Sequence, residues 1–265
     1  MVAGIAAATT NNAVGIAGVA WDASVLPVKV LNSHGVGDDF QVAAGIVWAV
    51  GHGASIVNLS LGGPAESAGL CDAVDYASSM RVLVVVAAGN GHTGEPQYPA
   101  ACPGAVAVSA TDTNGDFASF SNYGPWVSLA APGIQITSTR SNELYGAESG
   151  TSLAAPIVTG VAALLRAEHP DWNPTQIASH LEQTAQDRGP AGIDPYYGHG
   201  LVDAYAALGG PGRSAVLASG DGSEPNDAPN QAPLLGASAR GTIAPEGDVD
   251  WYAVRVRAPA RSRSR

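Results

Sequence analysis

The chain has 265 residues, enough for one large α/β domain or for a domain with an appendage. Its net charge of −11 argues against nucleic acid and anionic membranes as partners, because both are polyanions that repel it. Charged residues make up 13% of the chain, against the roughly 25% usual in globular proteins, and 33 residues are glycine. This composition indicates a tightly packed core of small residues. No apolar run approaches the roughly 20 residues that would span a bilayer.

Segments of strand and helix length alternate along the chain. Apolar runs that indicate strands lie at 25–31, 55–60, 82–88 and 105–109. Helical patterns lie at 2–8, 40–51, 68–79 and, later, 173–186. This alternation indicates βαβ units and a parallel sheet, and the run 82–88 is almost wholly apolar, as expected of a strand covered on both faces. In such sheets ligands bind beyond the C-terminal ends of the strands, where Ser60 and Asn90 fall.

A long apolar helical pattern begins at the motif Gly-Thr-Ser-Leu-Ala-Ala-Pro, residues 150–156. Apolar residues recur at helical spacing through Leu165 with small residues between them, which indicates a helix buried nearly all round. Pro156 cannot donate to the carbonyl of Ser152, so the backbone is loosened there. Ser152 could cap this helix, or it could be an exposed nucleophile whose developing oxyanion meets the free N–H groups of the first turn. The segment alone favours the cap.

Four short motifs, taken in order, resemble segments of the subtilisin-like serine proteases, the subtilase family. Residues 2–5 resemble the helix after the catalytic His, 60–63 the substrate-binding strand, 87–90 the oxyanion-hole segment and 150–156 the nucleophile segment. The resemblance extends from Met1 to about Leu208. It implies an α/β fold with a doubly wound, mostly parallel sheet and helices on both faces. It also implies a serine endopeptidase that acts on polypeptide substrates.

The resemblance implies roles for individual residues. Ser152 would be the nucleophile, and the side-chain amide of Asn90 with the backbone N–H of Ser152 would form the oxyanion hole. Two segments would flank an extended substrate backbone as neighbouring strands do. They are Ser60, Leu61, Gly62 and Gly63 on one side, and Gly35 and Gly37 on the other. Outside this context, Asn90 beside Gly89 would be interpreted as a turn residue.

The Asp and the His of the family's triad have no counterpart in the sequence, since both segments would precede Val2. None of the six histidines occupies a matching position: His34, His52, His92, His169, His180 and His199. No signal peptide is found either, so we expect a secreted bacterial protease that lacks its N-terminal part and is inactive in this form. The alternative is an inactive relative that binds extended peptides. An esterase is disfavoured, because no Gly-x-Ser-x-Gly motif surrounds Ser152.

The expected chemistry requires no cofactor, but the loop 10–16 resembles the family's structural calcium loop. Asn12 would contribute its side-chain oxygen, and Thr10, Val14 and Ile16 their carbonyl oxygens. The carboxylate ligands of the family would precede Met1, so the site would be incomplete. An Asx-type turn is the alternative for a loop of this kind.

Cys71 and Cys102 are the only cysteines of the chain. They could be two buried, reduced thiols, as in a cytosolic protein. An even number of cysteines in an enzyme expected to be extracellular favours a disulfide between them. Such a bridge would stabilise the fold by closing the intervening loop.

The C-terminal quarter of the chain differs in character from the rest. Residues 197–204 resemble the closing segment of the protease family, and 209–223, rich in Gly, Ser and Pro, indicate a linker. Residues 224–260 resemble the opening of the bacterial pre-peptidase C-terminal domain, a small β-sandwich. The basic end at 261–265 has no counterpart there and indicates a truncated gene end, with a nucleic-acid-binding tail as the weaker alternative. We expect a monomer that binds neither nucleic acid nor membrane.

Overall fold

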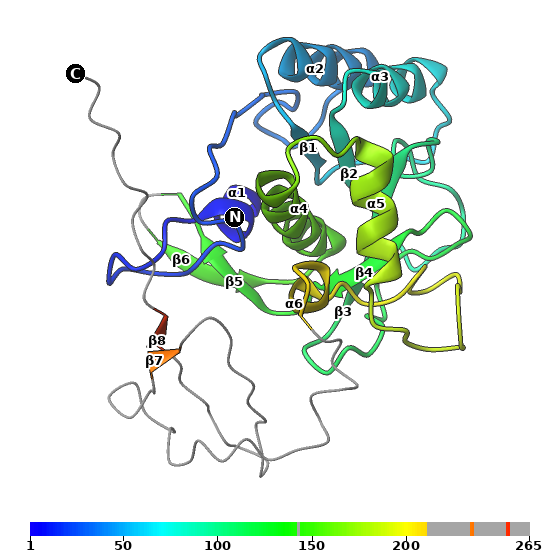
Figure 1. Cartoon of the computed structure of the whole chain (residues 1–265). Helices are drawn as coiled ribbons and strands as arrows, with labels where there is room; N and C mark the ends of the chain where they lie inside the picture. Colours follow the sequence, from blue (N-terminus) through cyan, green and yellow to red (C-terminus); the bar gives the residue numbers. More distant parts are fainter. Residues whose placement is uncertain (142–143, 211–233, 236–252, 255–265) are drawn as a thin grey trace, which may run out of the picture. The chain divides into compact units, whose positions relative to one another are not determined.

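The computed structural model describes residues 1–141, 144–210, 234–235 and 253–254 (Figure 1). The chain divides into two compact units, Met1–Gly210 and Pro211–Arg265. In the second unit the described residues form one short parallel pair, β7 (Leu234–Leu235) with β8 (Ala253–Val254). The expected linker beyond Gly210 and the expected β-sandwich of 224–260 otherwise lie outside the described residues.

Four parallel strands form the central sheet of the first unit, in the order β1-β2-β3-β4. They are β1 (Ile56–Leu59), β2 (Leu83–Ala87), β3 (Ala105–Thr111) and β4 (Leu129–Pro132). The first three match the predicted apolar runs. The strands have the same order in the sheet as in the sequence. These four strands therefore lack the reversal of strand order that marks the doubly wound sheet we expected. Of the three connections between these strands, the one from β1 to β2 carries a helix.

Helices cover both faces of this sheet (Figure 1). Side chains of a strand alternate between its two faces. In β2, Val84 and Val86 pack with α2 (Asp39–Gly51) and α3 (Ala68–Ser79). Leu83 and Val85 pack with the opposite pair, α4 (Thr151–Glu168) and α5 (Pro174–Gln183). The parallel α/β class with flanking helices is therefore the observed architecture.

Two short helices and a pair of strands complete the first unit. The N-terminal helix α1 (Val2–Ala7) packs against α4 so closely that a side chain at Gly160 would meet Val19 and the carbonyl of Ala6. An antiparallel pair, β5 (Ile136–Thr139) and β6 (Tyr145–Glu148), lies between β4 and α4 in the sequence. The short helix α6 (Ala204–Ala207) follows α5.

The predicted strand at 25–31 is wrong, because these residues form no strand. Val25 and Leu26 are 51% and 41% exposed, whereas Val28 and Val30 pack partly buried against the α2–α3 core. The strand β1 pairs with β2 alone, so segment 25–31 gains side-chain burial without the backbone ladder that defines a strand. Pro27, which has no N–H to donate, disfavours such a ladder.

Cys71 and Cys102 are joined in a disulfide, with their Cα atoms 5.1 Å apart. Cys71 lies in α3, and Cys102 lies in the turn before β3 and is 3% exposed. The bridge spans 31 positions of the sequence and therefore ties α3 to the start of β3 across the whole of β2. The alternative of two reduced thiols does not describe this structure.

Removing the bridge should lower the free energy of unfolding. We expect the double substitution Cys71→Ser with Cys102→Ser to cost about 3–4 kcal/mol, because the unfolded chain regains the entropy that the closed loop removes. Urea denaturation followed by circular dichroism measures the loss. A reducing agent should lower the midpoint of the wild type and leave that of the double variant unchanged; equal effects on both proteins would contradict the bridge.

Candidate active site

Ser152 is the second residue of α4 and does not cap it. The capping position belongs to Gly150, which has no side chain to form a capping bond. The capping interpretation of Ser152 is therefore wrong, and its hydroxyl has no role in starting the helix. As the second helical residue, Ser152 also has a backbone N–H with no partner inside the helix. Its Oγ lies 3.4 Å from the carbonyl oxygen of Ser60.

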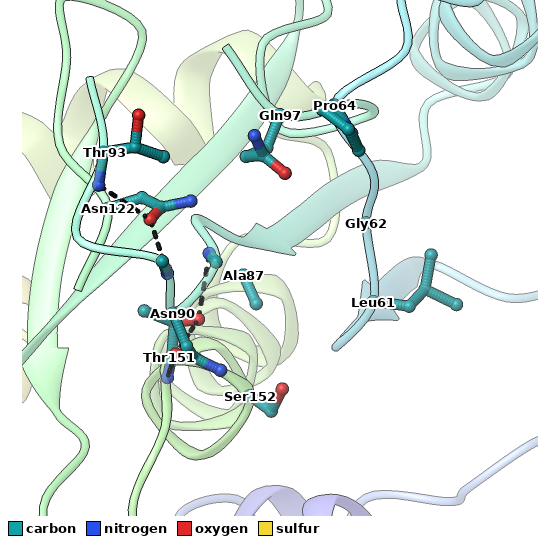
Figure 2. A pocket seen from close by; sticks show the side chains of 12 residues that line it. Leu61, Gly62, Pro64, Ala87, Asn90, Thr93, Gln97, Asn122, Thr151 and Ser152 are labelled. Atoms are coloured by element: carbon teal, nitrogen blue, oxygen red, sulfur yellow. Dashed lines mark hydrogen bonds between the residues drawn. The ribbon is translucent and has the colours of Figure 1, made fainter. Parts of the chain in front are cut away.

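Asn90 lies in the loop that follows β2, and its side-chain oxygen is bound to the first turn of α4. Oδ1 accepts hydrogen bonds from the backbone N–H of Thr151 at 2.8 Å and from the Thr151 hydroxyl at 3.0 Å. A backbone N–H can only donate, so the atom facing it must be the amide oxygen. The Thr151 hydroxyl in turn accepts from the N–H of Gly89 at 3.0 Å. The amide nitrogen of Asn90 therefore points toward the space beside Ser152, as Figure 2 shows.

A cleft of about 340 Å³ opens beside the Ser152 hydroxyl (Figure 2). Leu61, Gly62 and Pro64, from the segment after β1, line one wall. The loop Gly89–Gly91 lines the opposite wall, with Thr93 and Gln97 beyond it. Both walls are segments that follow the C-terminal ends of parallel strands, the rim at which ligands bind in sheets of this kind.

The cleft brings together some of the predicted site residues. Ser152, Asn90, Leu61 and Gly62 all line it, and Ser60 is hydrogen-bonded to Ser152 from the adjoining wall. Gly63 is not among the lining residues, and its backbone forms a two-bond bridge with Tyr98.

Gly35 and Gly37 are not among the residues that line the cleft. They lie in an exposed turn in which the side-chain oxygen of Asn32 accepts from the N–H groups of His34 and Val36. Their role as the second flank of a substrate stays a prediction.

Asn122 is the site residue that the sequence analysis missed. It is 2% exposed, and its Oδ1 accepts from the N–H of Gly91 at 2.8 Å and from that of Thr93 at 3.2 Å. Its Nδ2 donates to the carbonyl of Ala88 at 3.0 Å. One buried side chain thus holds both ends of the loop that carries Asn90. An asparagine between Ser and Tyr carries the signal of a turn residue, and nothing local indicates these partners.

The structure describes all six histidines, and none of them lines the cleft or hydrogen-bonds to Ser152. His52 and His180 contact the carbonyls of Trp48 and Ala207. The others have different neighbours: His169 stacks on Trp172, His199 is 3.8 Å from Glu182, His92 packs against Tyr123, and His34 lies in the exposed turn. The described residues therefore place no imidazole base beside Ser152.

The loop 10–16 forms an Asx-type turn. The N–H of Val14 donates to Oδ1 of Asn12 at 3.1 Å, and both residues are exposed. Calcium takes six to eight oxygen ligands, and this loop offers the side-chain amide oxygen of Asn12 without a carboxylate. Within the described parts of the chain no three His, Cys, Asp or Glu side chains gather as metal ligands. A calcium site formed by Asn12 and the carbonyl oxygens of Thr10, Val14 and Ile16 stays a prediction.

Comparison with known proteins identifies the family. The model of the family described as "Subtilase family", peptidase S8, matches residues 1–200. The chain belongs to the subtilase family. This is a family of hydrolases, the subtilisin-like serine proteases.

Individual subtilases are similar to the chain over most of its length. M-protease of Shouchella clausii (strain KSM-K16) is 46% identical over 206 residues, which cover 78% of this chain and 53% of that protein. Subtilisin Savinase of Lederbergia lenta is 45% identical over 206 residues, covering 78% of this chain and 75% of its own length. A solved protease structure from Pseudoalteromonas arctica PAMC 21717 matches with a TM-score of 0.73 and 38% identity, covering 78% of this subtilase and 69% of that chain.

The chain spans about half the length of the first curated relatives it matches. Among the helices that the structure describes, none is long and apolar enough to cross a bilayer.

Replacing Asn122 should loosen the loop that carries Asn90. Asn122→Asp keeps the acceptor for Gly91 and Thr93 but turns a second acceptor oxygen toward the carbonyl of Ala88. Burial and that carbonyl should raise the pKa of the new carboxyl above its unfolded value of about 3.9. The variant should therefore lose about 1–3 kcal/mol at neutral pH and regain part of it as the pH falls through the raised pKa, where the protonated oxygen can donate.

Urea denaturation between about pH 4 and pH 8 tests this, with stabilities expressed relative to the wild type. Asn122→Ala serves as the matched control, since it loses the same contacts without adding a titratable group. A loss in Asn122→Asp that does not vary with pH would contradict the bond to Ala88.

Proposed function

We propose that this subtilase is a serine endopeptidase in which Ser152 attacks the peptide carbonyl and Asn90 helps to bind the resulting oxyanion. One observation carries the proposal: the Ser152 hydroxyl and the amide nitrogen of Asn90 face the same cleft. The unpaired N–H of Ser152 is the second donor for the oxyanion, at the positive end of α4. Donors held in place before the reaction stabilise the negative charge that develops on the carbonyl oxygen.

The reaction also needs a base, which takes the proton of the Ser152 hydroxyl as its oxygen bonds to the carbonyl carbon. The same group then returns the proton to the leaving amine, and a carboxylate orients the base. The described cleft supplies neither a histidine nor a carboxylate. We therefore propose that the base and the carboxylate are supplied by residues other than those that line the described cleft. We also propose that the chain by itself shows no Ser152-dependent turnover.

The wall formed by Leu61 and Gly62 is the proposed docking edge for the substrate. An extended peptide can pair with such an edge through its backbone and place alternate side chains into pockets. The recess between this wall and the loop Gly89–Gly91 then receives one substrate side chain. Ser60 and Gly63 hold the ends of the wall through Ser152 and Tyr98.

The proposed cellular setting follows from the disulfide. Bridges such as Cys71–Cys102 form and persist in oxidising surroundings, which supports secretion. A monomeric state and a structural calcium ion stay predictions. No further cofactor is needed for the steps above.

The second candidate function is that of an inactive relative that binds extended peptides. The observation that favours it is the absence of a histidine among the residues that line the described cleft. Both candidates bind peptides along the same wall, so binding alone does not separate them. The two candidates are separated by measuring turnover after a base has been supplied.

A chimera provides the test. The residues of subtilisin Savinase that precede its match to this chain are joined ahead of Val2, and cleavage of an unstructured protein substrate is measured. We expect no Ser152-dependent cleavage by the chain itself and clear cleavage by the chimera. In the chimera, Ser152→Ala should lower kcat by at least about 10⁴-fold. Asn90→Ala should lower it about 10²–10³-fold, the loss a subtilisin shows without its oxyanion asparagine.

Ser79→Ala is the control variant, since Ser79 ends α3 and does not line the cleft. A folded chimera that binds the substrate without cleaving it would favour the inactive relative. Cleavage by the chain itself that disappears in Ser152→Ala would show that one of its own side chains acts as the base.

A further inference from the structure

Pro156 interrupts the hydrogen-bond pattern of α4 at the nucleophile. In an α-helix the carbonyl of residue 152 accepts from the N–H of residue 156, and proline has no N–H. The carbonyl of Ser152 therefore lacks its donor inside the helix. A backbone carbonyl that loses contact with water and finds no partner costs free energy, so another donor at the partly buried Ser152 would stabilise the helix.

The hydroxyl of Ser60, directly after β1, is that donor. Its Oγ lies 2.9 Å from the carbonyl oxygen of Ser152. The same Oγ accepts a hydrogen bond from Nδ2 of Asn58, in β1, at 3.0 Å. Because Asn58 donates to the Ser60 oxygen, the proton of the Ser60 hydroxyl is left for the Ser152 carbonyl.

Thr159, farther along α4, fixes the orientation of the Asn58 amide. Its hydroxyl lies 2.8 Å from Oδ1 of Asn58 and 3.0 Å from the carbonyl of Ala155. That carbonyl already has a helical donor in the N–H of Thr159 and does not need the hydroxyl. With the amide reversed, the Ser60 proton would turn to Asn58 and the Ser152 carbonyl would be left unpaired. Pairing of every carbonyl thus requires that Thr159 donates to Asn58.

We propose that Asn58, Ser60 and Thr159 form a positioning relay that replaces the bond lost at Pro156 and holds Ser152 at the cleft. The relay joins α4 to the segment that continues into the cleft wall at Leu61 and Gly62. The relay therefore fixes the distance between Ser152 and the cleft wall at Leu61 and Gly62. The three residues are positioning residues that act through Ser152, and the functional part of the inference rests on the proposed function of Ser152.

A double-mutant cycle on the full chain tests the central bond. Ser60→Ala should lower the equilibrium constant for folding about tenfold, the loss expected for one intramolecular hydrogen bond. In Pro156→Ala the new N–H can pair with the Ser152 carbonyl, so the further cost of Ser60→Ala should fall below about threefold. Equal costs of Ser60→Ala in the two backgrounds would overturn the proposal.

Thr159 offers a matched pair of variants for the outer bond of the relay. Thr159→Val removes the hydroxyl at nearly constant volume, and Thr159→Ser keeps it. The carbonyl ¹³C NMR shift of Ser152 should move upfield in Ser60→Ala and in Thr159→Val, and should stay at its wild-type value in Thr159→Ser. A shift that responds to Ser60→Ala alone would remove Thr159 and Asn58 from the relay.

The chimera described above supplies the functional measurement. Ser60→Ala and Thr159→Val should each lower kcat about tenfold with KM changed less than about twofold, and Thr159→Ser should retain kcat. Loss in KM alone would mean that Ser60 acts on the substrate and would overturn the positioning role. If the chimera is inactive, the proposed function fails, whereas the folding cycle and the NMR shifts still decide whether the relay exists.

Discussion

The contact between the side-chain oxygen of Asn90 and the first turn of α4 is the constraint on which the site depends. An amide has one oxygen and one nitrogen, so fixing the oxygen on Thr151 decides where the nitrogen points. One of the two donors is a backbone N–H, which every residue other than proline would supply. The contact also joins two segments distant in sequence, the loop after β2 and the start of α4. Their relative position is therefore determined by the fold before any ligand arrives.

The backbone path of the loop after β2, which carries Asn90, depends on Gly89 and on Asn122. Gly89 has φ +104°, and a Cβ there would clash with the amide nitrogen of Asn122. Glycine is required both for the backbone conformation and for the close approach of that amide. Asn122 then satisfies three backbone groups of the loop at once. A loop supported in this way has few alternative conformations, as expected where polar networks in an interior are complete.

Local patterns predicted a large part of the fold and the centre of the site. The bounds of α3 agree with the predicted helix, and the apolar run at 82–88 contains β2, because periodicity and burial determine such elements nearly alone. The prediction of a strand at 25–31 failed because a strand needs a neighbouring strand to pair with. The residues of the segment do not reveal whether such a strand is present. Ser152 and Asn90 came from motifs, whereas Asn122 and Thr159 act through partners far away in sequence. Contacts between residues far apart in the sequence produce no periodic pattern in it, so the sequence alone does not predict them.

The disulfide has a consequence for what happens when the chain is cut. Cys71 and Cys102 close a covalent ring that contains all of β2, Asn90 and the wall residues that follow. A single break anywhere in this ring leaves both ends attached to the rest of the molecule. The parallel pairing of β2 with β1 and β3 would keep the cut ends close together. The part of the chain that carries Asn90, the proposed oxyanion donor, is thus the part that survives a nick without being released.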